Sequence, residues 1–107
     1  MKAASPKFSF PRAELEAFCQ RWRVTEISVF GSAVREDFRD ESDIDLLVDF
    51  EPEARHTIFD GVAMEDELRE LFNRDVDLVE KRAILASDNY LRRDHILGTA
   101  QVIYGDR

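Results

Sequence analysis

Three aspartates stand at spacings that could do chemistry. Asp43 and Asp45 are two residues apart, and Asp77 lies in a later stretch of similar character. Because side chains alternate along a strand, a two-residue spacing puts both carboxylates on one face. Crowded carboxylates repel one another unless cations lie among them, and hard oxygen ligands suit Mg²⁺. We therefore expect Asp43, Asp45 and Asp77 to hold Mg²⁺, with two ions between them.

The pair Gly31-Ser32 supplies a complementary site for an anion. Glycine lets the backbone approach a phosphate closely, amides at a helix start favour an anion, and the Ser32 hydroxyl adds a donor. Arg35, one turn further on, could add a phosphate contact or pair with Asp37 or Glu36 on the surface. Phosphates on one side and a carboxylate-bound metal pair on the other are what phosphoryl or nucleotidyl transfer requires.

These residues need strands that bring them to one edge of a sheet. We predict strands at 26–30, 42–50 and 75–79, because each run is rich in branched apolar residues. The connection through 33–41 holds at most a short helix, so the first two strands should be antiparallel, whereas a helical crossover makes the last two parallel. This topology gathers the glycine-serine pair and the three aspartates at the same edge.

Helices are predicted on either side of these strands. Ser9 can cap a first helix with Pro11 in its first turn, and a capping box of Thr57 and Asp60 opens a second. A last helix covers 91–100. The apolar residues at helical spacing in the first helix are Leu15, Phe18, Cys19 and Trp22. Those predicted to point inward from the second are Ile58, Val62, Leu68, Leu71 and Phe72. The predicted fold class is α/β (α+β), a small mixed three-stranded sheet with flanking helices.

The composition fits one folded acidic domain. The chain has 107 residues, 15 Lys and Arg against 23 Asp and Glu, a net charge of −8, and 44% hydrophobic residues. A chain of this size buries about two-thirds of its surface, which supports one core. We expect a short flexible tail over 1–8 and a single domain over 9–107. The acidic balance argues against direct nucleic-acid binding and fits a basic protein partner or a divalent cation.

The remaining features favour a cytoplasmic protein. Cys19 is the only cysteine, so no intramolecular disulfide can form, which is typical of a reducing compartment. The apolar runs are too short to span a membrane, and no secretory signal is visible. We therefore expect no membrane partner.

Two runs resemble the minimal nucleotidyltransferases of the DNA polymerase β-like superfamily. Their signature, G-S-x-x-R and then S-D-[IVL]-D-L after a short insert, is matched by residues 31–35 and 42–46. The family's third carboxylate lies in a later strand, which here resembles the stretch around Asp77. One departure is Glu36, which stands where the family often has Gly. The resemblance covers residues 12–104, nearly the whole chain.

The resemblance implies a polymerase β-like fold and a Mg²⁺-dependent transfer of a nucleoside monophosphate, AMP from ATP, to a hydroxyl. Asp43 and Asp45 would bridge the metals, Asp77 would bind the catalytic metal and assist deprotonation, and the glycine-serine pair with Arg35 would hold the triphosphate. Small members of the family resemble antitoxins that adenylylate a tyrosine of a HEPN-domain RNase toxin. The expected partner is therefore a HEPN-type toxin or another basic protein.

Other interpretations stay open. The domain could neutralise a toxin by contact alone, with idle carboxylates, or it could bind Mg·NTP as a regulatory module without turnover. A second copy of the chain could complete the site, so a homo-oligomer is possible. A Rossmann dehydrogenase is poorly supported, because no G-x-G-x-x-G follows the first strand.

Overall fold

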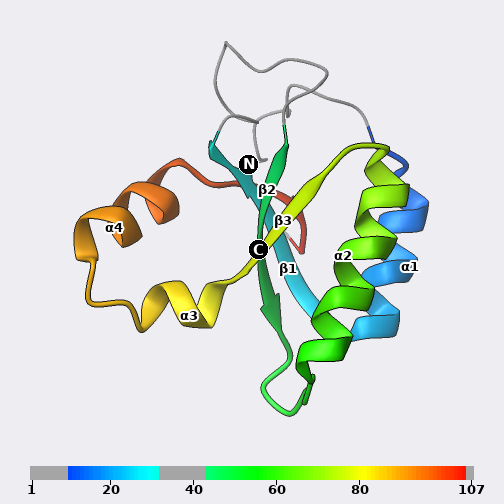
Figure 1. The fold of residues 1–107 in the computed structure, drawn as a ribbon, viewed down its shortest axis with the longest axis horizontal. Helices are drawn as coiled ribbons and strands as arrows, with labels where there is room; N and C mark the ends of the chain where they lie inside the picture. Colours follow the sequence, from blue (N-terminus) through cyan, green and yellow to red (C-terminus); the bar gives the residue numbers. More distant parts are fainter. Residues whose placement is uncertain (1–9, 32–42, 106–107) are drawn as a thin grey trace.

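Four strands form a mixed sheet with helices on both faces (Figure 1). This computed structural model describes residues 10–31 and 43–105, and the strand order is β3-β2-β1-β4. The elements are α1 (Arg12–Trp22), β1 (Val24–Phe30), β2 (Ile44–Phe50), α2 (Ile58–Phe72), β3 (Val76–Glu80), α3 (Lys81–Leu85), α4 (Tyr90–Thr99) and β4 (Gln101–Tyr104). The predicted fold class is confirmed, although the predicted number of strands was one too low.

The strand pairing follows the prediction. β1 and β2 are antiparallel, and β2 and β3 are parallel across the α2 crossover. The additional strand β4 pairs antiparallel with the free side of β1. Its four residues were not predicted because they directly follow a helix: Ala100 leaves the helix in an extended conformation (φ −65°, ψ 141°) without a glycine or proline to mark the change.

The main core lies on the sheet face that α1 and α2 cover. Ile44, Leu46 and Val48 alternate along β2 and point into this core, with exposures of 0 to 2%. Each fully buried side chain of this size contributes about 1.5–3 kcal/mol. The buried members of the core are Leu15, Phe18, Cys19, Val24, Ile27, Val29, Ile44, Leu46, Val48, Met64, Leu68, Phe72, Val76 and Ile103.

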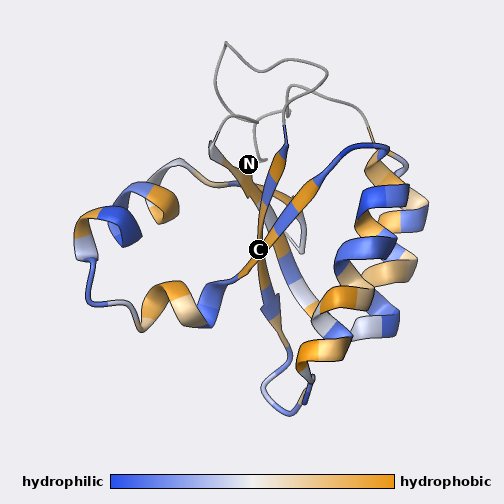
Figure 2. Cartoon of the chain, in the orientation of Figure 1, coloured by the Kyte–Doolittle hydropathy of each residue, from blue (hydrophilic) through white to orange (hydrophobic). Residues whose placement is uncertain are grey.

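A much smaller core lies on the opposite sheet face, under α3 and α4 (Figure 1). Its buried members are Phe30, Leu47, Ile84 and Ile96. Figure 2 shows that hydrophobic and hydrophilic segments alternate along the helices on both sides of the sheet. Among the described residues, no helix is long and apolar enough to cross a membrane.

The capping box of α2 is confirmed. The Asp60 N–H donates to Thr57 Oγ1 at 3.1 Å, and the Thr57 N–H donates to Asp60 Oδ2 at 2.9 Å. The helix ends at Phe72, and the next residue, Asn73, takes the left-handed conformation (φ 58°) of a C-terminal cap. The two reciprocal hydrogen bonds therefore fix where α2 begins, as the sequence spacing predicts.

The inward face of α2 was predicted only in part. Met64, Leu68 and Phe72 are buried at intervals of four residues, whereas Ile58 and Val62 are 85% and 55% exposed. Two residues along a helix turn the side chain by more than half a circle, so Val62 cannot share the face of Met64. The prediction that Ile58 and Val62 point inward was therefore wrong.

The first helix places its cysteine in the core. Leu15, Phe18 and Cys19, which recur at helical spacing, are buried, and the N-cap is Pro11, which offers no side-chain hydrogen bond. Ser9, the predicted cap, lies outside the described residues. Burial, with a smaller contribution from neighbouring Glu16, raises the pKa of the Cys19 thiol from 9.0 to about 12.

Native Cys19 is therefore expected to resist thiol reagents. At pH 8 its thiolate population is about a thousandfold lower than that of an exposed thiol, so an aromatic disulfide reagent should label it only after unfolding. Because the pKa is raised in the folded state, the thiol's contribution to the free energy of unfolding is complete below pH 9 and lost between pH 9 and 12. The resistance of Cys19 to labelling is measured by time courses of the reaction with and without denaturant. Equal labelling rates in the two conditions would contradict this prediction.

Candidate functional site

Three strand ends meet at one edge of the sheet, at the top of the ribbon in Figure 1. Phe30, the last residue of β1, pairs with Asp45 on β2, and Asp45 pairs with Asp77 on β3. Gly31 directly follows Phe30. The topology therefore brings Gly31, Asp45 and Asp77 side by side across three neighbouring strands, as the sequence pattern predicts.

Asp45 and Asp77 lie on the sheet face opposite the main core. On β2, Ile44 and Leu46 point into that core, so Asp45 shares its face with Leu47, a member of the smaller core. On β3, Val76 is in the main core, so Asp77 faces the other way. Neighbouring strands lie about 4.8 Å apart, which lets side chains in register approach one another.

Asp43 lies one residue before β2 and is exposed. The ladder to β3 reaches it, because the Ile44 N–H donates to the Asp75 carbonyl at 2.9 Å. Within residues 10–31 and 43–105, no three His, Cys, Asp or Glu side chains are gathered closely enough to hold a metal ion. The donor set nevertheless suits Mg²⁺, which is bound by one or two carboxylates and keeps its other positions for water and phosphates.

Gly31 lies directly under the carboxylate of Asp45. Its φ of +70° is in the left-handed region, and a Cβ added there would stand 2.4 Å from Asp45 Oδ2. Only glycine fits this position without displacing the carboxylate. Ser32 and Arg35, the other predicted phosphate contacts, lie outside the described residues, as does Glu36.

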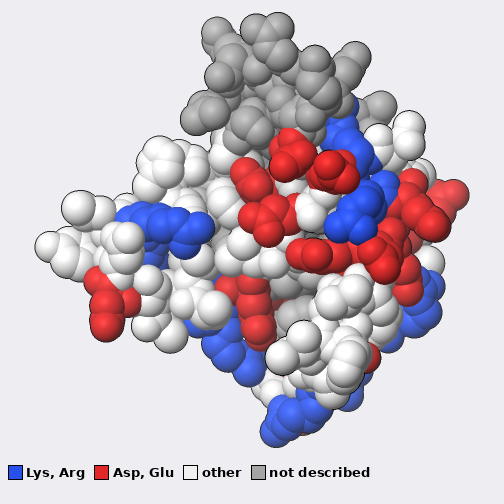
Figure 3. All heavy atoms as spheres, in the orientation of Figure 1, with Lys and Arg blue, Asp and Glu red and all other residues white. Residues whose placement is uncertain are grey.

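Charged side chains surround this edge. Figure 3 shows Asp and Glu side chains gathered on the visible face beside the undescribed atoms. Arg69 of α2 makes ion pairs there with Glu65, Asp66 and Asp75. Glu65 also accepts a hydrogen bond from the Leu78 N–H at 3.2 Å. Sequence reasoning missed these α2 residues, since a Glu–Arg pair four residues apart is common on any solvated helix.

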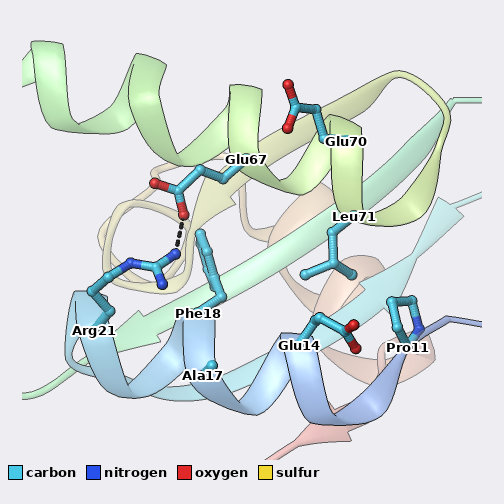
Figure 4. A pocket seen from close by; sticks show the side chains of 8 residues that line it. All are labelled: Pro11, Glu14, Ala17, Phe18, Arg21, Glu67, Glu70 and Leu71. Carbon is cyan, nitrogen blue, oxygen red and sulfur yellow. Dashed lines mark hydrogen bonds and ion pairs between the residues drawn. The ribbon is translucent and has the colours of Figure 1, made fainter.

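A separate groove lies between α1 and α2 (Figure 4). Phe18 and Leu71 contribute its apolar part, and Arg21 forms an ion pair with Glu67 across it. Glu67 also accepts a hydrogen bond from the Trp22 indole N–H at 3.1 Å. Because α1 and α2 cover the sheet face opposite Asp45, this groove belongs to the helix packing and not to the carboxylate edge.

Comparison with known proteins identifies relatives of this chain. A family model described as a nucleotidyltransferase domain matches residues 13–97. The protein adenylyltransferase MntA of Thermococcus cleftensis is 40% identical over 65 residues, which cover 61% of this chain and 64% of that protein. A putative protein adenylyltransferase of Methanocaldococcus jannaschii is 34% identical over 84 residues, which cover 78% of this chain and 84% of that protein.

Solved structures share the same fold. A putative minimal nucleotidyltransferase superposes with a TM-score of 0.63 at 32% identity, covering 83% of this chain and 85% of the other. A structure described as a toxin–antitoxin with AMP-PNP superposes with a TM-score of 0.67 at 18% identity, covering 90% of this chain and 74% of the other. The second likeness concerns the fold alone.

Proposed function

Because this chain belongs to the nucleotidyltransferase domain family, we propose that it transfers AMP from ATP to a hydroxyl group of a partner protein, in a reaction that depends on Mg²⁺. Both curated relatives described above carry the name of protein adenylyltransferase, the one from Methanocaldococcus jannaschii as a putative enzyme. The structural observation that carries the proposal is the register that aligns Gly31, Asp45 and Asp77 at one sheet edge.

Different residues of the chain are proposed to bind the nucleotide donor and to activate the acceptor hydroxyl. Gly31 is proposed to let the backbone approach the triphosphate closely. The Ser32 hydroxyl and Arg35 are proposed to bind the β and γ phosphates. Mg²⁺ held by Asp43, Asp45 and Asp77 would neutralise phosphate charge and activate the attacking oxygen. Asp77, which is exposed, is proposed to accept the hydroxyl proton while the oxygen bonds to the α-phosphorus and pyrophosphate leaves.

The proposed acceptor is a tyrosine of a HEPN-type toxin. Structures of similar fold are described as MntA–HepT toxin–antitoxin complexes, and one similar complex contains AMP-PNP. The net charge of −8 suits a basic partner, because complementary charge steers association. Modification of that tyrosine would make this protein the antitoxin of the pair.

Intact-mass spectrometry tests the proposal. The protein is incubated with Mg²⁺ and each nucleoside triphosphate in turn, with and without the protein encoded beside it. We expect the partner to gain one AMP from ATP, and expect the gain to disappear without Mg²⁺ and in Asp43→Asn. A stable complex without any mass gain would instead favour an antitoxin that acts by contact, and nucleotide binding without product would favour a sensor.

A further inference from the structure

One side chain of α2 holds the outer edge of β3 just beyond Asp77. β3 is the outermost strand on one side of the sheet, so the N–H groups on its outer side have no neighbouring strand to bond to. Glu65 Oε2 accepts the Leu78 N–H at 3.2 Å and so takes the place of a neighbouring strand. Its side chain is 33% exposed, so this hydrogen bond is partly shielded from water.

A second α2 side chain holds the chain just before Asp77. Arg69 Nε lies 3.6 Å from Asp75 Oδ1, and Arg69 Nη2 lies 4.0 Å from Glu65 Oε1. The Asp75 carbonyl accepts the Ile44 N–H at 2.9 Å, so this residue also ties β3 to β2. The residues on both sides of Asp77 are thus attached to one turn of α2.

The support for this attachment is rigid. Met64 and Leu68, which neighbour the two residues along the helix, are 2% and 0% exposed in the main core. A helix anchored in this way can fix the position of the five-residue strand β3 along its own axis. Without it, the pairing with β2 and the packing of Val76 and Leu78 on the main core would set the position of Asp77.

We propose that Glu65 and Arg69 are positioning residues that fix Asp77 opposite Asp45. They act through the backbone of β3 and the Asp75 side chain, and they touch neither nucleotide nor metal. The inference rests on the proposed function, since it assigns these residues to the same metal-binding edge. Supporting residues of metal sites typically change metal affinity or activity by about 10- to 100-fold when they are replaced.

The test compares three variants on α2. Glu65→Ala removes the acceptor, Glu65→Gln keeps an acceptor oxygen but loses the charge, and Glu70→Ala changes an α2 carboxylate that lines the α1–α2 groove. Amide hydrogen exchange at Leu78 is measured by NMR, and Mg²⁺ affinity is measured by calorimetry with a non-hydrolysable ATP analogue. Thermal unfolding and the rates of transfer at saturating Mg²⁺ complete the set.

In Glu65→Ala we expect amide exchange at Leu78 to become faster and Mg²⁺ affinity to fall by about tenfold. Glu65→Gln should recover most of both, and Glu70→Ala should match the wild type. A lower melting temperature in Glu65→Ala with unchanged Mg²⁺ affinity would overturn the proposal, as would a wild type that binds no Mg²⁺. If the wild type binds Mg²⁺ but transfers no nucleotide, the proposed function fails while exchange and affinity still decide the positioning role.

Discussion

Asp45→Asn is expected to lower the rate of nucleotidyl transfer by at least about 10³-fold, because a metal ion held at the proposed site would stabilise the transition state by several kcal/mol. Asp45 occupies the middle of the site, between Gly31 and Asp77. Asparagine has nearly the same shape, so the fold should persist. Removing one of two like charges in register should leave the melting temperature unchanged or slightly higher.

AMP incorporation into the partner and thermal unfolding of the variant measure the two parts of this prediction. Asp49→Asn is the matched control, because Asp49 lies on the same strand and by alternation on the same face, four residues from the carboxylate edge. It should keep wild-type activity. Full transfer by Asp45→Asn would refute the assignment of this edge as the catalytic site.

Gly31→Ala is expected to have the second largest effect. The added Cβ would stand 2.4 Å from Asp45 Oδ2, so the carboxylate must move, and the φ of +70° is strained for alanine. The strain costs about 1–3 kcal/mol of stability. A displacement of about 1 Å at the reacting groups can cost about 10²-fold in rate, so transfer should fall by that factor.

Thermal unfolding and transfer rates of Gly31→Ala are compared with those of Gly61→Ala. A Cβ at Gly61 on α2 meets nothing within 4 Å, and alanine favours a helix by about 0.8–1.0 kcal/mol, so this control should be slightly more stable and fully active. The double variant Gly31→Ala with Asp45→Ala should recover the part of the stability that the clash removes. Additive losses would show that the two residues do not collide.

Much of the fold is predictable because its signals are local. Alternation along β2, the Thr57–Asp60 capping box and the helical crossover each depend on neighbouring residues, and the structure agrees with them. β4 was not predicted because four residues after a helix are too few to show the two-residue alternation of a strand. Its partner strand, β1, is also far away in the sequence. The exposure of Ile58 was missed because hydrophobicity alone does not say which helix face meets the sheet.

The part of the candidate site that depends on strand order and register could be predicted from the sequence. The placement of Asp45 beside Asp77 follows from strand topology, since the starts of parallel neighbours share an edge. The close approach of Gly31 to the Asp45 carboxylate could not be predicted, because a sequence pattern does not specify the distance between two side chains or turns. The hydrogen bond from Leu78 to Glu65 depends on how α2 rests against β3, which only the packed structure reveals.

The division of β2 between its two faces has an evolutionary consequence. Every second residue of the strand builds the main core, while Asp45 projects from the opposite side and contributes nothing to it. Replacement of Asp45 by asparagine is therefore expected to leave the free energy of unfolding almost unchanged, and selection for a stable chain does not remove it. A lineage with this architecture can lose the reaction through one such substitution and persist as a folded pseudoenzyme.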